Sequence, residues 1–393
     1  MLSVTPLLTG ARTRSDSLRY GRRSGKLPSH LLHYSADKKP VVVWTSTRRC
    51  NLHCMHCYTD SNDRVGPNEL DTSEAMGMVE QLAAFGCPVL LISGGEPLAR
   101  GDVFDVAERA VELGMRVVFS TNGTLIQAEH VERFTKIGVS YVGISIDGRP
   151  ATHDKFRGQV GAFEASMAAV EACGEAGLRT GLRFTLTKAN QGDLPWLLAL
   201  MEERKVPRLC VYHLAPSGRG ARIGQFAPTG VETRAALDLL FDHAERSGAE
   251  ILTADNHADN AYLWMRVADQ QPERADEVWE LLEWNGGNQS GQAIACIDSD
   301  GTVYPDQFWR WQGLGNVREE GFEAIWATDP PPLLRELRDR RSRLPERCQG
   351  CRFVSVCNGN FRSRAEAMTG DRWGADPFCY LSDEEIASVG ATA

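Results

Sequence analysis

"RRCNLHCMHCYTDS" (residues 48–61) contains three cysteines, Cys50, Cys54 and Cys57, with a histidine in each gap between them. We call this segment the cysteine loop. A structural zinc site usually takes four ligands, and a disulfide framework is typical of small secreted chains rather than of one with 393 residues. The histidines keep zinc open as an alternative. Three cysteines without a fourth nevertheless predict a centre with one position left for a group from outside the protein.

The cysteine loop follows the first of six short apolar segments that alternate with amphipathic ones. This alternation predicts a parallel sheet with helices outside it, either an open barrel or a doubly wound sheet. The expected strands are 41–45, 89–93, 116–120, 141–146, 182–186 and 209–214, and the expected helices between them are 73–85, 103–113, 131–137, 162–176 and 194–203. Chemistry collects at the carboxyl ends of such strands, where "TSTRRC", "SGGEP", "STNGT" and "SIDG" are found.

Composition narrows the classes of function. The chain is 42% hydrophobic and 24% charged, as is ordinary for a globular protein, and no apolar run approaches the roughly 18 residues of a membrane span. The net charge of −9 argues against nucleic-acid binding. Residues 1–49 hold ten of the 43 basic residues and two of the 52 acidic ones. We expect a cytoplasmic protein whose basic N-terminal segment is either a solvated extension or an arm that covers an anionic substrate.

The Cys-x-x-x-Cys-x-x-Cys spacing, followed by "SGGEP" after the second strand, resembles the radical SAM superfamily. The resemblance implies a partial (β/α)6 barrel, similar to part of a TIM barrel. It also implies a four-iron, four-sulfur cluster on the three loop cysteines. The fourth iron would bind S-adenosylmethionine (SAM), whose reductive cleavage gives a 5′-deoxyadenosyl radical.

The same resemblance implies a SAM site at the strand ends. Glu96 would receive the methionyl ammonium, and Ser145 and Asp147 the ribose hydroxyls. His56 would pack near adenine. The alternative is that His56 has only a structural role in the loop. Arg183 would face the methionyl carboxylate, with a salt bridge inside the barrel as the alternative. The expected cofactor-binding residues are His56, Gly94, Gly95, Glu96, Pro97, Asn122, Ser145, Asp147 and Arg183.

A second group of cysteines lies near the end of the chain: Cys348, Cys351, Cys357 and Cys379. Its spacing resembles the auxiliary-cluster domain called SPASM, or the shortened form called twitch, and implies a second four-iron cluster. A Cys-four zinc site is the alternative. A full SPASM domain has a cysteine where this chain has Phe361 and another near Asp306, and both are absent here. We therefore expect a single auxiliary cluster. Cys296 is then left as a lone ligand, a redox thiol or an inert one.

Residues from about 15 to 385 resemble one branch of the superfamily, enzymes that modify iron tetrapyrroles. "YHLAPSGRG", "ADNHAD", "YPDQFWR" and "GDRWGADPFCYL" are among the segments that carry this likeness. It implies removal of the two acetate side chains of 12,18-didecarboxysiroheme to give Fe-coproporphyrin III in siroheme-dependent haem biosynthesis. Conversion of propionates to carbonyl groups, as in haem d1 biosynthesis, is the first alternative, and a SPASM peptide maturase is the second.

The resemblance to tetrapyrrole-modifying enzymes implies two partners. They are an iron tetrapyrrole substrate and an external electron donor of the ferredoxin or flavodoxin type. The candidate substrate contacts are Tyr212, His213, Arg219, Phe308, Trp309 and Arg310, which offer cations for carboxylates and flat rings for a macrocycle. Core packing is the alternative for the aromatic residues. His257 is the candidate catalytic residue, as a ligand of the substrate iron or a proton donor, and a helix-capping histidine is the alternative.

The expected organisation has five parts. Residues 1–39 form a basic extension, 40–225 the barrel, 226–290 a helical connection, 291–385 a small cysteine-rich SPASM/twitch domain, and 386–393 a tail.

Overall fold

The computed structural model describes residues 1–11 and 39–387. Within them the strands form one sheet in the order β1-β8-β7-β6-β5-β4-β3-β2-β9-β10-β11. The strands from β8 to β9 are parallel, and β1, β10 and β11 are antiparallel to their neighbours. Their bounds are β1 Leu2–Ser3, β2 Val41–Thr45, β3 Val89–Ser93, β4 Arg116–Thr121, β5 Tyr141–Ser145, β6 Thr180–Leu186, β7 Arg208–His213, β8 Glu250–Ala254, β9 Ile294–Ile297, β10 Thr302–Tyr304 and β11 Gly315–Asn316.

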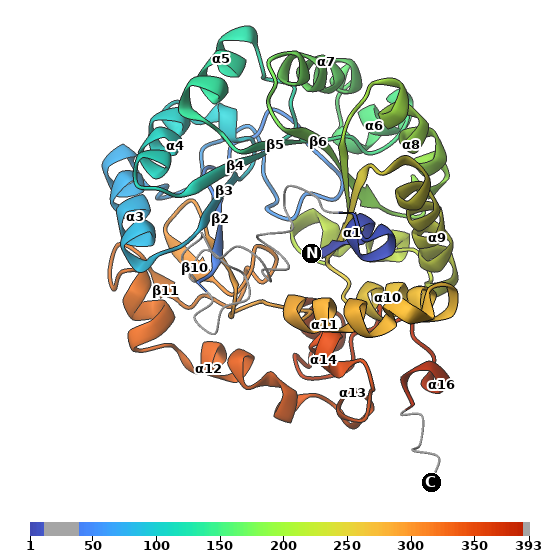
Figure 1. Ribbon diagram of the computed structural model, residues 1–393. Helices are drawn as coiled ribbons and strands as arrows, with labels where there is room; N and C mark the ends of the chain where they lie inside the picture. Colours follow the sequence, from blue (N-terminus) through green and yellow to red (C-terminus); the bar gives the residue numbers. More distant parts are fainter. Residues whose placement is uncertain (12–38, 388–393) are drawn as a thin grey trace.

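The sheet curves into a partial barrel with helices on its outer face (Figure 1). These helices are α3 Thr72–Phe85, α4 Val103–Glu112, α5 Ala128–Ile137, α6 Pro150–Arg157, α7 Ala162–Glu175, α8 Leu194–Glu203 and α9 Gly230–Ser247. Further along the chain come α10 Ala258–Gln270, α11 Ala275–Asn285, α12 Pro332–Arg338, α13 Glu346–Gln349, α14 Val354–Cys357, α15 Arg362–Thr369 and α16 Asp383–Ile386. Each barrel helix places apolar side chains against the sheet, for example Met78 and Leu82 of α3, both fully buried. The expected α/β barrel is therefore confirmed.

Three expectations about the organisation need correction. The segment 226–290 is not only helical, because β8 lies within it and extends the parallel sheet beyond β7. All five residues of β8 are buried, so it lacks the alternation that marks a half-buried strand.

The start of the chain is not an extension either. Leu2 pairs with Thr253 of β8, and α1 (Val4–Thr9) buries Leu7 in the core. Most of the expected basic segment falls within 12–38, which lies outside the described residues. The expected boundary at 291 falls within the sheet, because β9 pairs in parallel with β2.

None of the helices in the described ranges is long and apolar enough to cross a membrane.

Candidate active site

The cysteine loop begins directly after β2 and packs against the segments that follow β3 and β5. Glu96 N donates to Arg49 O at 2.9 Å, and Met55 N donates to Phe156 O at 2.9 Å. These backbone bonds fix the loop at the carboxyl ends of the parallel strands, where the motifs of the sequence were expected to meet.

Arg219 ties the loop together from the segment after β7. Its Nε donates to Cys54 O at 2.7 Å, and its Nη1 donates to Ser61 O at 2.7 Å and to Asp60 Oδ1 at 2.9 Å. The residue is buried. Because the guanidinium of Arg219 forms these hydrogen bonds with the cysteine loop, we favour a role in stabilising the loop over the expected contact with substrate.

The three loop thiols are free and each has a polar neighbour. Leu52 N donates to Cys50 Sγ at 3.4 Å, and Arg157 Nη1 donates to Cys54 Sγ at 3.5 Å. Ser61 N donates to Cys57 Sγ at 3.4 Å. In the part of the chain that the structure describes, no three His, Cys, Asp or Glu side chains are gathered as ligands of one metal ion. Each cysteine of a four-iron cluster binds a different iron, so a cluster does not require convergence on one point.

The thiols open into a space that we call the loop cavity, lined also by Gly94, Gly95, Asn122, Ser145 and Arg183. A second space, the lumen cavity, lies inside the barrel. They hold about 1080 and 1770 Å³ of space between protein atoms, part of it open to solvent. Both are lined by Arg183, Tyr212 and Phe308, so the two cavities meet there.

The glycines of "SGGEP" are required by loop packing. A Cβ atom on Gly95 would lie 2.2 Å from Arg49 O, and one on Gly94, whose φ is +142°, would lie 2.7 Å from Thr47 O. Pro97 begins a short 3-10 helix, Pro97–Ala99. The glycines thus let this turn touch the backbone of the cysteine loop, besides exposing it to the cavity.

The Glu96 carboxylate is fully buried beneath the cavity. It accepts from Thr121 Oγ1 at 2.6 Å and from Asn122 N at 2.8 Å, and burial raises its pKa. The Asn122 side chain donates to Asn51 Oδ1 at 3.0 Å, which links the end of β4 to the cysteine loop. The expected contact of Glu96 with an ammonium stays a prediction.

Asp147 lies behind the cavity wall. Its carboxylate pairs with Arg157 Nη2 at 2.5 Å and lies 3.7 Å from His56 Nε2. Ser145 does line the loop cavity. We therefore favour a role for Asp147 in positioning Arg157 over the expected ribose contact. The expected ribose contact of Ser145 stays a prediction.

His56 lines the loop cavity and packs on Phe156, with ring centroids 5.3 Å apart. Burial lowers the pKa of His56 to about 4, so its ring is neutral at pH 7. A neutral ring on this wall is compatible with the expected packing near adenine.

The sequence analysis did not single out Arg157, the last residue of α6. It lines the loop cavity and donates to Cys54 Sγ. The signal was present in "THDKFRG", because Arg157 lies one helical turn after His153 and faces the strand end that carries Asp147.

Four of the substrate candidates lie on the cavity walls, one of them Arg219, which lines the loop cavity. Tyr212 and Phe308 line both cavities, and Phe308 packs against Tyr58 with ring centroids 5.2 Å apart. His213 lines the loop cavity and bonds through Nε2 to Asp259 Oδ2 at 2.9 Å. Tyr212, Phe308 and His213 remain candidates for contact with a flat ligand.

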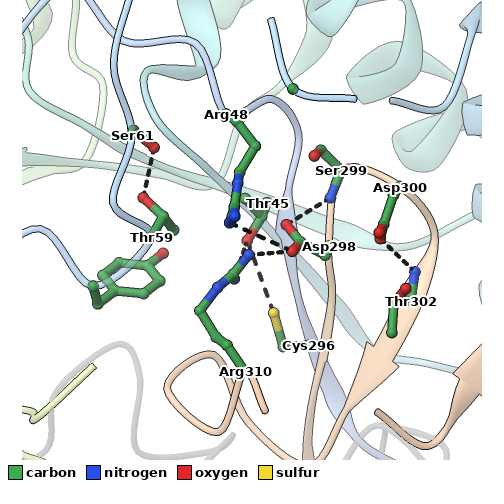
Figure 2. A network of polar contacts seen from close by, with 12 residues as sticks. Thr45, Arg48, Thr59, Ser61, Cys296, Asp298, Ser299, Asp300, Thr302 and Arg310 are labelled. Carbon is green, nitrogen blue, oxygen red and sulfur yellow. Dashed lines mark hydrogen bonds and ion pairs between the residues drawn. The ribbon is translucent and has the colours of Figure 1, made fainter. Parts of the chain in front are cut away.

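Trp309 and Arg310 have partners within the protein. Trp309 is fully buried and donates through Nε1 to Glu366, so core packing, the alternative reading, accounts for it. Figure 2 shows Arg310 and Arg48 directed at the carboxylate of Asp298. Arg310 thus connects the region after β10 with the cysteine loop, and this ion pair is favoured over a contact with substrate.

Cys296 and His257 are buried. Cys296 lies in β9, 3.9 Å from Thr45 Oγ1 (Figure 2), and burial raises the pKa of its thiol to about 12. A protonated, fully buried thiol favours the inert reading. His257 is the N-cap residue of α10 without a side-chain capping bond, and it lines the lumen cavity. Burial lowers its pKa well below the usual value.

Two of the C-terminal cysteines belong to short helices, Cys348 to α13 and Cys357 to α14, and α14 lies next to α11 (Figure 1). Burial raises the pKa of the Cys357 thiol, and Cys379, Cys348 and Cys351 raise it further because they are close. Arg347 Nη1 donates to Cys379 Sγ at 3.6 Å. The fold therefore gathers four thiols that are far apart in the sequence.

Comparison with known proteins decides the family. The Radical SAM superfamily profile matches residues 44–200, and an iron-sulfur cluster-binding SPASM profile matches residues 289–352. The chain is 48% identical over 394 aligned residues to Fe-coproporphyrin III synthase of Methanosarcina barkeri, covering 98% of this chain and 99% of that protein. The chain belongs to the radical SAM superfamily. It is also 42% identical to pre-heme d1 synthase of Dinoroseobacter shibae, over 89% of this chain and 88% of that protein.

A solved structure has a similar fold. Streptococcus suis SuiB bound to precursor peptide SuiA superposes with a TM-score of 0.71 at 20% identity, covering 87% of this chain and 76% of SuiB. At that identity the likeness concerns the fold alone.

Membership of the radical SAM superfamily implies SAM and a four-iron cluster, and the SPASM match implies further iron–sulfur binding. The residues fit these groups. Three thiols face a cavity at the strand ends, and the Nδ1 atom of His56, on the same wall, is buried without a hydrogen-bond partner. The four C-terminal thiols act on one another electrostatically and are available for a second cluster.

Proposed function

We propose that this radical SAM enzyme removes the two acetate side chains of 12,18-didecarboxysiroheme to give Fe-coproporphyrin III. The observation that carries the proposal is the 48% identity to Fe-coproporphyrin III synthase along nearly the full length of both chains. The alignment with pre-heme d1 synthase is less identical and leaves about a tenth of this chain unmatched.

The proposal assigns two sets of cluster ligands. The loop cysteines, Cys50, Cys54 and Cys57, hold the SAM-binding cluster, and Cys348, Cys351, Cys357 and Cys379 hold one auxiliary cluster. When bound, SAM and its cluster supply the radical that removes a hydrogen atom from a reduced pyrrole ring. The protein positions this chemistry by fixing the loop through Arg219 and through the glycines of "SGGEP".

The cavities suggest how the chain receives its substrate. Phe308 and Tyr212 offer ring faces at the junction of the two cavities, where a macrocycle in the lumen cavity would meet the radical source in the loop cavity. Aromatic walls stack on flat ring systems and exclude water. The proposal also includes a cytoplasmic location and an electron donor of the ferredoxin or flavodoxin type.

The test is anaerobic incubation of reconstituted protein with SAM, a reductant and 12,18-didecarboxysiroheme, followed by mass analysis of the tetrapyrrole. Loss of mass equal to two acetate arms supports the proposal. Carbonyl groups in place of propionates would assign the chain to the haem d1 reaction, and an unchanged tetrapyrrole would favour a peptide substrate. A variant with all three loop cysteines replaced by alanine is the control that should leave SAM and tetrapyrrole intact.

A further inference from the structure

The side chain of Arg183 reaches the junction of the two cavities from the middle of β6. Its guanidinium lies over the ring of Tyr212, 4.4 Å from the centroid. Among the described residues, no carboxylate lies within ion-pair distance of this guanidinium. A buried cation is costly unless an anion compensates it.

The titratable groups that act most strongly on the pKa of Arg183 do not supply that anion. They are Tyr212, Cys210, Tyr141 and Tyr58. Burial raises the pKa of each of these three tyrosines, to about 12 for Tyr58, so they are neutral at pH 7. Arg208, the neighbouring cation in the lumen, differs in having Glu250 at 3.9 Å.

The sheet makes room for this arginine. Gly143 lies in β5 beside it, and a Cβ atom there would lie 2.8 Å from Arg183 Cδ. Glycine weakens a strand interior and commonly marks a place of close approach. The missing side chain at Gly143 therefore lets the arginine stem lie along the barrel wall.

Arg183 lines both cavities, and a different arginine contacts the thiols. Arg157 is the guanidinium that contacts a loop cysteine, with Nη1 3.5 Å from Cys54 Sγ, and is therefore better placed to meet the carboxylate of a ligand at the cysteine loop. Of the groups around Arg183, Tyr141 and Cys210 line the lumen cavity alone, Tyr212 lines both cavities, and Tyr58 lines the loop cavity alone, so the arginine can reach a ligand in the lumen cavity.

We propose that Arg183 binds a carboxylate side chain of the tetrapyrrole in the lumen cavity and so sets which edge of the macrocycle faces the cysteine loop. This assignment deepens the proposed function and rests on it. It replaces the expectation that Arg183 binds the carboxylate of SAM. The arginine fork suits a carboxylate because two parallel N–H bonds can form.

The experiment measures anaerobic binding of Fe-coproporphyrin III, which carries four propionates, and of its tetramethyl ester to the reconstituted holoenzyme. R183Q should bind the acid about ten-fold to a hundred-fold more weakly than wild type does, as expected for loss of a charged hydrogen-bonded pair. The ester should bind both proteins alike. R183K should recover part of the affinity, and R133Q, which removes an exposed arginine paired with Asp105, is the matched control.

The dissociation constant for SAM, measured on the same samples, separates the two roles. A large loss of SAM affinity in R183Q with unchanged binding of the acid would make Arg183 a SAM ligand and overturn the inference. Equal weakening of acid and ester would also overturn it, because it would show a general change in cavity shape. A wild type that binds neither tetrapyrrole overturns the proposed function and this inference together, whereas tight, equal binding of the acid by wild type and R183Q overturns only the assignment of Arg183.

Discussion

Replacement of Arg219 by methionine tests whether this residue supports the cysteine loop or binds substrate. Methionine keeps an apolar stem of similar length but removes three hydrogen bonds. One of them ends on the buried carbonyl oxygen of Ser61, and leaving this acceptor unsatisfied costs about 1–3 kcal/mol. Another ends on Cys54 O, which still accepts from Cys57 N at 3.4 Å, so its loss costs about 0.5–1.5 kcal/mol. The bond to half-exposed Asp60 adds less than about 1 kcal/mol. We therefore expect the loop to be destabilised by about 2–5 kcal/mol.

The destabilised loop is the one that carries the three cysteines. R219M should retain about four of about eight irons after reconstitution, those of the C-terminal site, and should lose SAM cleavage even without substrate. Iron analysis and detection of 5′-deoxyadenosine measure these outcomes. R222M is the matched control, because Arg222 lies 4.0 Å from the same Asp60 but is 76% exposed. Full iron content and normal SAM cleavage in R219M, with loss of turnover alone, would refute loop support and restore the substrate role.

Three further predictions follow from the same contacts. C351A should lower bound iron from about eight to about four atoms while SAM cleavage persists; an unchanged iron content with one zinc in the wild type would instead establish the zinc alternative. G95A should abolish SAM cleavage because its Cβ would meet a backbone oxygen at 2.2 Å, whereas G101A, whose Cβ would have no neighbour within 4 Å, should not. Burial lowers the pKa of His153 to about 4, so an unfolded chain takes up the proton first as the pH falls. Thermal stability should therefore decline from about pH 6.5 towards pH 4, by about 3 kcal/mol in all, and a melting temperature that declines equally in H153N would contradict this.

Much of the barrel could be predicted because its strands are apolar, short and separated by amphipathic segments. The bounds of β2 and β3 agree with the prediction residue for residue. β8 could not be found in the same way, because a fully buried five-residue strand has no alternation of buried and exposed residues. The N-terminal strand β1 pairs with β8, so β1 could not be predicted while β8 was unknown.

The candidate site shows the same division between local and tertiary information. Spacing alone identified the loop cysteines and "SGGEP", because these contacts are made by short continuous segments. Trp309 bonds to Glu366, and Arg310 pairs with Asp298. These partners lie outside the motif, so no local pattern could predict the two contacts. The role of a cationic or aromatic residue in a motif could therefore be inferred only after its contacts inside the protein were known.

The continuity of the sheet also bears on how the two cysteine sites are related. β2 leads directly into the cysteine loop and pairs along its length with β9. The segment before β9 packs closely on the C-terminal cysteines, since a Cβ atom on Gly287 would lie 2.3 Å from Cys357 O. Asn288 N also donates to that oxygen at 3.1 Å. The two sites are thus joined through neighbouring strands of one sheet, without a flexible linker between them. A change in ligation at the C-terminal site would therefore act on the strand that borders β2, and tetrapyrrole turnover in C351A should fall further than SAM cleavage does.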